Sequence, residues 1–141
     1  MQKIDAPEGA SPGFGGYHPP VGGNSTRSYS RLSLVGDYLV VGTHGNQNTA
    51  YVYVRDGDTW ALQQTLSPNR LSGVALSNQT LALTTADPWS VSSGVNLYHL
   101  TEGAWKFWKY LPPPIPSFLG APIQTHNKVA IDGNRVAAGV Y

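Results

Sequence analysis

The sequence has little charge, no cysteine and no long apolar run, and each absence narrows what the protein can be. Charged residues make up 12% of its 141 residues, about half the usual share, and the formal net charge is only +1. A near-neutral chain without a run of Lys or Arg has no general attraction to nucleic acid or anionic lipid, so we expect neither partner. The absence of cysteine excludes disulfides and thiolate metal sites. No apolar run approaches the roughly 20 residues that cross a bilayer, so we expect no membrane insertion.

Glycine and proline are plentiful, with 16 and 11 residues, which favours many turns between short strands. A helical interpretation fails, because no window keeps apolar residues at i, i+3, i+4 and i+7 without a glycine, a proline or a β-branched cluster. The length of 141 residues suits one ordinary domain with a real core. The composition therefore predicts an all-β domain.

One short phrase occurs three times along the chain. It is "LSLVGDYLVVGT" from Leu32, "VALSNQTLALTT" from Val74 and "VAIDGNRVAAGV" from Val129. Each copy has two apolar runs joined by turn-forming residues such as Gly36-Asp37, and strands joined so closely pair antiparallel. The phrase therefore predicts the same β-hairpin three times.

The first two hairpins are each followed by a second pair of strands. The segments "AYVYVRDGDTWALQQTL" and "VNLYHLTEGAWKFWKYL" both indicate strand, turn and strand, and Trp60 and Trp105 open the last strand of each. The unit thus has four antiparallel strands, and Leu34 and Leu76 are about 42 residues apart. Four strands repeated every 40 to 50 residues or so are typical of a β-propeller blade. Because the two tryptophans recur at the same place, we expect them to pack between blades or at the outer strand.

Two long loops are rich in glycine and proline. They are "APEGASPGFGGYHPPVGGNST" before the first hairpin and "PPPIPSFLGAPIQTH" before the third. Proline cannot donate to a strand ladder, so we expect both to run extended over the surface. Long ordered loops of this kind often carry function.

The four-strand unit resembles the FG-GAP repeat, the blade of integrin-α-like β-propellers. The phrases that carry the resemblance are "VGDYLVVGTHG", "TAYVYVRDGDTWALQQTL" and "QKIDAPEGASPGFGG". The resemblance covers nearly the whole chain, and is strongest over 30–66 and fair over 71–111. It implies a non-enzymatic role in protein binding or cell adhesion and favours an extracellular or cell-surface location. The opening "MQKIDAPEGASPGFGG" has no apolar segment of a secretory signal peptide, so the sequence itself leaves the compartment open.

The same resemblance implies that the propeller is incomplete. Gln2 to Ile4 is similar to the end of a blade's outer strand, and "RVAAGVY" is similar to the second strand of a new blade, where the sequence ends. A closed propeller needs at least about four blades, and exposed sheet edges promote aggregation. We therefore expect an incomplete propeller that associates with copies of itself, with other chains or with the rest of a longer polypeptide. Its expected parts are an outer strand with a Gly/Pro-rich loop (1–29), two blades (30–66 and 67–111), and a Pro-rich loop with the start of the next blade (112–141).

Several blades of that family hold calcium in a D-x-D-x-D-G-like loop between the second and third strands. The corresponding loops here, "THGNQNTA" and "TADPWSVSSG", contain a single acid, Asp87, whereas an oxygen cage needs several carboxylates. The four histidines are scattered without the spacing of a ligand set: His18, His44, His99 and His126. We therefore expect no calcium, no other metal and no cofactor.

Nucleophilic catalysis has no support in the sequence, because there is no cysteine and no serine in a nucleophile-elbow setting. Four aspartates lie in predicted turns, where such carboxylates commonly bind local amides. These are Asp37, Asp56, Asp58 and Asp132. We expect them to be structural and the protein to be no enzyme.

Aromatic and amide side chains are the candidates for contact with a partner. Trp108 is an odd number of positions from Trp105, so that strand carries an indole on each face, and one of the two should be exposed or covered by another chain. Trp89 lies in the loop "ADPWSVSSG" and has no counterpart in the other unit; it can contact a partner or a sugar ring or can pack on its own blade. The loop "HGNQNT" adds the amides of Asn46 and Asn48, which suit a carbohydrate, with His44 beside them.

Two Asn-x-Ser/Thr sequences begin at Asn24 and Asn78. They are glycan acceptors if the chain passes through a eukaryotic secretory route, and Asn78 suits a turn equally well.

We therefore expect a partial propeller that binds or assembles through loops held on rigid blades, with protein partners or copies of itself. Two alternatives stay open. One is a structural repeat that forms polymers or a larger complex without a small ligand. The other is a carbohydrate-binding propeller lectin.

Overall fold

The computed structural model describes residues 4–8, 31–43, 48–85, 94–112 and 125–140. Every regular element in these ranges is a β-strand. The strands are β1 (Leu32–Val35), β2 (Tyr38–Gly42), β3 (Ala50–Asp56), β4 (Thr59–Leu66), β5 (Leu71–Leu76), β6 (Thr80–Thr85), β7 (Gly94–Thr101), β8 (Ala104–Leu111), β9 (Thr125–Asp132) and β10 (Arg135–Val140). The prediction of an all-β chain is confirmed.

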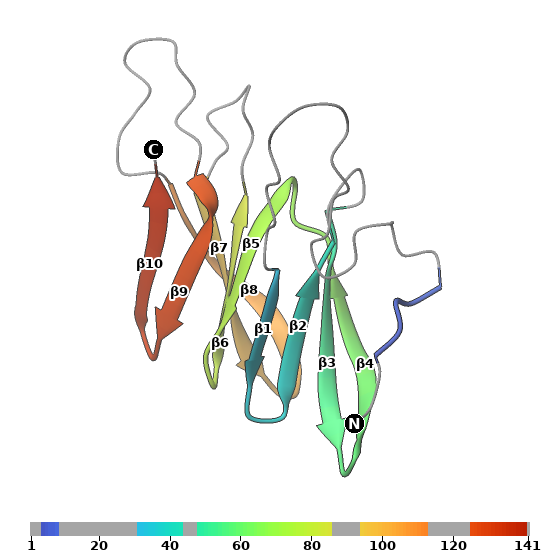
Figure 1. Ribbon diagram of the computed structural model, residues 1–141. Coiled ribbons are helices and arrows are strands. Elements are labelled where there is room, and N and C mark those ends of the chain that lie inside the picture. The colour runs from blue at the N-terminus through green and yellow to red at the C-terminus, as the bar shows by residue number, and fades with distance from the viewer. Residues whose placement is uncertain (1–3, 9–30, 44–47, 86–93, 113–124, 141) are drawn as a thin grey trace, which may run out of the picture.

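The strands form three antiparallel sheets that lie side by side (Figure 1). The first sheet has the order β1-β2-β3-β4, the second has the order β5-β6-β7-β8, and β9 and β10 make a two-stranded C-terminal hairpin. The repeated phrase forms the first two strands of each sheet, as expected, and the four-stranded antiparallel unit is confirmed twice. The three sheets do not close into a ring within the described residues.

The first and second sheets repeat one another down to an irregularity in their register. Between β3 and β4 the register shifts after Val52, which leaves Gln63 as the extra residue of β4. Between β7 and β8 it shifts after Leu97, which leaves Trp108 as the extra residue of β8. A bulge of this kind bends the outer strand and redirects one side chain. Gln63 and Trp108 therefore occupy equivalent positions in the two sheets.

The turns between outer strands explain why the sequence carries glycine there. Gly57 and Gly103 have φ values of 58° and 75°, in the left-handed region that residues with a side chain rarely adopt. Glu102 also has a positive φ, of 53°, so the β7–β8 turn has the pair of left-handed residues that matches the twist of a hairpin.

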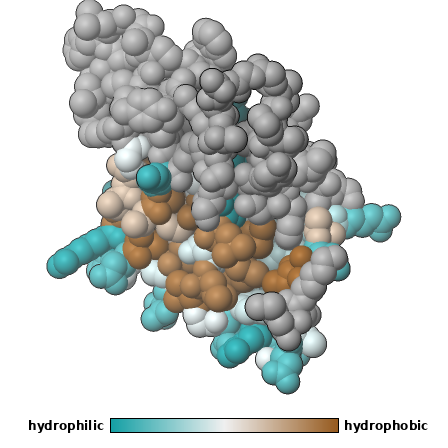
Figure 2. Space-filling model, in the orientation of Figure 1, coloured by the Kyte–Doolittle hydropathy of each residue, from teal (hydrophilic) through white to brown (hydrophobic). Residues whose placement is uncertain are grey.

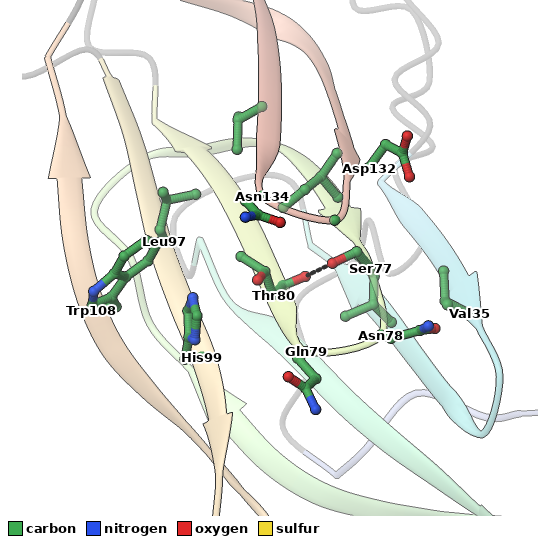
Figure 3. Close-up of a pocket in the computed structure, with 14 residues that line it drawn as sticks. Val35, Ser77, Asn78, Gln79, Thr80, Leu97, His99, Trp108, Asp132 and Asn134 are labelled. Atoms are coloured by element: carbon green, nitrogen blue, oxygen red, sulfur yellow. Dashed lines mark hydrogen bonds between the residues drawn. The ribbon is translucent and has the colours of Figure 1, made fainter.

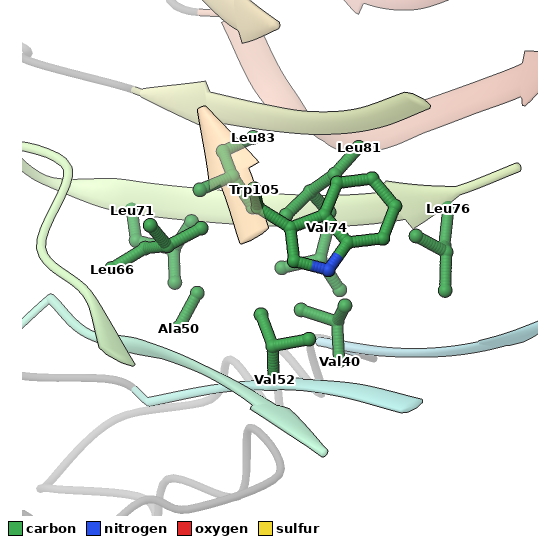
Figure 4. Packing of buried hydrophobic residues seen from close by; sticks show 10 residues of the cluster. All are labelled: Val40, Ala50, Val52, Leu66, Leu71, Val74, Leu76, Leu81, Leu83 and Trp105. Carbon is green, nitrogen blue, oxygen red and sulfur yellow. The ribbon is translucent and has the colours of Figure 1, made fainter. Parts of the chain in front are cut away.

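The second sheet lies between the other two, because β5 contacts β1 and β2 on one side and β9 on the other. Its face toward the first sheet carries larger side chains, which interlock with those of the first sheet (Figure 4). This cluster consists of Val40, Ala50, Val52 and Leu66 from the first sheet and Leu71, Val74, Leu76, Leu81, Leu83 and Trp105 from the second. The opposite face packs Ala75, Ala82, Val95 and Leu97 on the C-terminal hairpin, which contributes Val129, Ile131 and Val136. The second sheet is therefore apolar on both faces.

The two indoles of β8 have opposite environments. Trp105 is 2% exposed and meets the ring of Tyr38 edge-on, with ring centroids 5.5 Å apart, whereas Trp108 is 55% exposed. The expectation of one buried and one exposed indole on this strand is confirmed. The indole N–H of Trp105 has no hydrogen-bond partner within the described ranges, so its contribution comes from apolar contact.

We predict that Trp105→Ala lowers the free energy of unfolding by about 3–5 kcal/mol, because it empties a filled space between two sheets. Trp108→Ala is the matched control on the same strand and should change it by less than about 0.5 kcal/mol. Equilibrium denaturation in urea, followed by far-UV circular dichroism, measures both. Equal losses for the two variants would contradict the assignment.

Candidate functional site: the junction between sheets and its open equivalents

The edge strands of the first and second sheets are joined by a side-chain amide. Gln64 on β4 accepts a hydrogen bond from the Trp105 main-chain N–H at 2.8 Å and donates one from Nε2 to the Trp105 carbonyl at 3.0 Å. Because β8 is the edge of its sheet, these two groups of Trp105 face away from β7 and would otherwise need water. The Gln64 amide thus takes the place of a neighbouring strand at that residue.

Two further hydrogen bonds cross the same junction. The bulged Gln63 donates from Nε2 to the Gly103 carbonyl at 2.7 Å, which ties β4 to the β7–β8 turn. At the other end of the junction, the Leu76 N–H donates to the Ser33 hydroxyl at 3.0 Å. Together with the apolar cluster, these bonds fix how one sheet sits on the next.

The outer face of the first sheet, which points away from the second sheet, has the same pattern, and no sheet of the described residues covers it. Leu39, Val41, Tyr51 and Tyr53 form its buried centre, and Ile4 and the half-buried Trp60 pack against them. Around this centre large apolar side chains stay in solvent: Leu32 is 53% exposed, Leu34 56% and Leu62 45%. Figure 2 shows apolar surface over β1 in the middle of this view, with hydrophilic residues along the lower rim.

An open cleft lies at the other end of the stack, where the second sheet meets the C-terminal hairpin. It has a volume of about 880 Å³, and its walls come from the β5–β6 turn, the β9–β10 turn and the outer half of the second sheet. Figure 3 shows His99 and Trp108 together on one side, with Asn134 across from them and Gln79 and Asn78 at the turn. The His99 and Trp108 rings are in contact, with centroids 4.2 Å apart.

Both polar and apolar side chains line this cleft. Leu97, Ile131 and Val136 are its aliphatic wall, and Asp132 is the charged residue among those that line it. No lysine or arginine of the described ranges lines it, so a phosphate group would find no counter-charge there. Within the same ranges, no group of three or more His, Cys, Asp or Glu side chains is placed to hold a metal ion.

The structure brings together only some of the residues that the sequence singled out. Trp108 and Asn78 line the same cleft, and Asn78 is exposed in its turn. Asn48 is half-buried before β3, with a φ of 41°, and does not line the cleft. Four of the singled-out residues lie outside the described residues, so the contacts expected of them stay predictions: Asn24, His44, Asn46 and Trp89. Most of the two loops that were expected to hold no calcium also lies outside the described residues.

Three features of the site were not predicted from the sequence. Gln64 was not singled out, and its equivalent in the second unit is Lys109, so no repeated glutamine marks the position. The contact between His99 and Trp108 was not foreseen either. The Asp37 carboxylate was expected on local amides, whereas it accepts from Arg55 Nε at 2.9 Å and lies 2.8 Å from a terminal guanidinium nitrogen. This pair is more than half exposed on both sides, so it contributes little to stability.

Comparison with known proteins gives no relative: no family model, no curated protein and no solved structure matches the chain. In the part of the chain that the structure describes, no helix is long and apolar enough to span a membrane.

We predict that Gln64→Ala lowers the free energy of unfolding by about 1–3 kcal/mol, because it leaves the N–H and C=O of Trp105 without their partner. Gln63→Ala removes an exposed bond to Gly103 and should cost no more than about 0.5 kcal/mol. Urea denaturation of both variants measures the difference. A Gln64→Ala loss no larger than that of Gln63→Ala would show that the amide does not join the sheets.

Two tyrosines give the stack a dependence on alkaline pH. Burial raises the pKa of Tyr98, and burial together with the neighbouring Tyr51 raises the pKa of Tyr53. The folded state therefore holds these protons more tightly than the unfolded state, so their contribution to stability is complete below the ordinary tyrosine pKa of about 10 and is lost as the pH rises above it. We predict a fall in the denaturation midpoint above about pH 10. The fall should be smaller in Tyr98→Phe than in the wild type, and an identical fall in the two proteins would contradict this assignment.

Proposed function

We propose that this chain is a non-enzymatic binding and assembly module of FG-GAP-type propeller blades. In this proposal the first and second sheets are blades, the C-terminal hairpin begins a third, and further blades come from other chains or from the rest of a longer polypeptide. The module acts by packing the face of one sheet on the face of the next. An extracellular or cell-surface setting is part of the proposal through the family resemblance alone.

The observation that carries the proposal is a difference in burial between equivalent residues of the repeat. Val74 and Leu76 on β5 are buried against the first sheet, with exposed fractions of 7% and 4%. Their counterparts on β1, Leu32 and Leu34, are 53% and 56% exposed. The same apolar positions are thus kept in both sheets, although only one of the sheets has a neighbour on that side. Exposed apolar surface of this kind commonly marks an interaction site.

Trp60 supports the same conclusion. Its counterpart Trp105 lies in the cluster between the two sheets, against Tyr38 of the preceding sheet. Trp60 packs on the outer face of the first sheet, where Ile4 is the neighbour contributed from outside that sheet by the described residues. A further sheet on this face would cover Trp60 as the first sheet covers Trp105.

We predict that the purified chain associates with itself, because two copies can bury the exposed Leu32 and Leu34 of their first sheets against each other. Light scattering coupled to gel filtration should give a mass that rises with concentration. Leu32→Ser/Leu34→Ser should remain monomeric, whereas Phe107→Ser, which removes a 60% exposed aromatic residue elsewhere, should associate like the wild type. A wild-type chain that stays monomeric at every concentration and binds no hydrophobic dye would contradict the proposal.

A carbohydrate-binding function is the second candidate, and the cleft beside the C-terminal hairpin is the observation that favours it. An exposed indole next to planar amides is the usual composition of a sugar site. Titration of the full chain with neutral saccharides separates this candidate from the first proposal.

A further inference from the structure

We propose that the cleft beside the C-terminal hairpin is the seat of a β-hairpin of the same repeat, which adds to the free edge of β10 and covers Trp108. The occupant is a strand, a glycine turn and a strand with a tryptophan, like residues 50–66 or 94–111 of this chain. This inference relies on the proposed function, because it assumes that the C-terminal hairpin is completed as the other two sheets are.

Strand β10 has a free edge within the described residues. In the first two sheets the second strand pairs with a third, as β2 pairs with β3 and β6 with β7. Within the described residues β10 pairs with β9 alone. Because Asp132 and Arg135 form the first pair across a two-residue turn, alternation of the ladder directs the N–H and C=O of Val136 and Ala138 to the open side. An edge of this kind is a template for another strand.

The added strands would lie on the face of the second sheet that packs on the C-terminal hairpin. Val52 and Val54 on β3 face the second sheet, and Val52 is fully buried within the cluster that also contains Trp105. Leu97 and His99 take the same places on β7: Leu97 is 4% exposed, because the C-terminal hairpin packs on it, and His99 is half-buried and lines the open cleft. On this side of the second sheet the C-terminal hairpin thus covers Leu97, while the outer edge at His99 and Trp108 borders the open cleft.

The bulged residue of the outer strand differs between the first and second sheets. In the first sheet this residue is Gln63, and it bonds to the β7–β8 turn of the next sheet. In the second sheet it is Trp108, which is 55% exposed and touches His99. A hairpin on β10 would place its own turn beside Trp108. The contact would be apolar instead of a hydrogen bond, and burial of an indole makes it favourable.

The contents of the cleft agree with a hairpin and disfavour a charged ligand. The half-buried Ile131 and Val136 offer aliphatic surface for the side chains of an added strand, and a volume of about 880 Å³ accommodates several of them. Within the described ranges, the side chains of Asn78, Gln79 and Asn134 take part in no hydrogen bond. These amides can thus bond to the turn of an added hairpin, as the Gln63 amide bonds to the Gly103 carbonyl in the β7–β8 turn.

The chain supplies its own probe for the test. A labelled peptide of residues 50–66, "AYVYVRDGDTWALQQTL", is titrated with the full chain and followed by fluorescence anisotropy. We expect saturable binding with one peptide per chain. The same peptide with serine in place of Trp60 should bind at least about tenfold more weakly, since it lacks the side chain that fills the seat.

Variants of the full chain locate the binding. Ala138→Pro removes one N–H from the free edge of β10, and Trp108→Ala removes the exposed indole, so each should weaken peptide binding by about tenfold or more. Phe107→Ala is the matched control, because Phe107 is 60% exposed on the opposite face of β8, and it should change the affinity less than about twofold. Circular dichroism and a melting curve confirm that each variant is folded. Should Ala138→Pro unfold the chain, Trp108→Ala against Phe107→Ala still decides the test.

Three results would overturn the inference: no saturable peptide binding, equal binding by Trp108→Ala and Phe107→Ala, or saturable binding of a neutral saccharide that Trp108→Ala abolishes while the peptide does not bind. Leu32→Ser/Leu34→Ser separates this inference from the proposed function. That variant changes the far face of the first sheet, so it should lose self-association and keep peptide binding. If the wild-type chain does not self-associate but does bind the peptide, only the proposed function is contradicted.

Discussion

A sheet of this repeat is apolar on both faces, and this constraint determines most of the structure. The second sheet directs Val74, Leu76 and Leu81 to one neighbour and Ala75, Ala82 and Leu97 to the other. Such a sheet is stable in water only when both faces are covered, because each exposed face leaves several aliphatic side chains in solvent. Stacking is therefore part of how each sheet folds, and among the described residues the outer face of the first sheet is left open at Leu32 and Leu34.

Apolar packing alone does not set the distance and direction between neighbouring sheets. Leucine and valine pack acceptably in many arrangements, whereas a hydrogen bond needs defined positions for both partners. The Gln64 amide supplies this definition, since it contacts both main-chain groups of Trp105. The indole of the same residue fills the space between the sheets, so one residue links the polar and the apolar parts of the junction. If the proposed function holds, further sheets would be selected by a tryptophan and a glutamine in the same relation.

Sequence patterns predicted the hairpins, the four-stranded units and the opposite environments of Trp105 and Trp108. Those features depend on the alternation of side chains along a strand, which is a local property. The exposure of Leu32 and Leu34 could not be predicted in this way, because their pattern equals that of the buried Val74 and Leu76. What differs is the presence of a neighbouring sheet. Likewise, Gln64 and Trp105 are 41 residues apart in different units, and the cleft that Trp108 and Asn78 share forms where the second sheet meets the C-terminal hairpin. Periodicity within one unit carries no information about them.

Amide hydrogen exchange at Trp105 tests the central claim most directly. Its N–H lies on an edge strand and points away from the sheet, so without the Gln64 contact it would exchange almost as fast as in a frayed strand. If the junction holds the two sheets as one unit, this amide exchanges only through global unfolding, as slowly as Leu83 in the middle of the second sheet, and the protection disappears in Gln64→Ala. Fast exchange at Trp105 in the wild type, or protection that is unchanged in Gln64→Ala, would contradict the account.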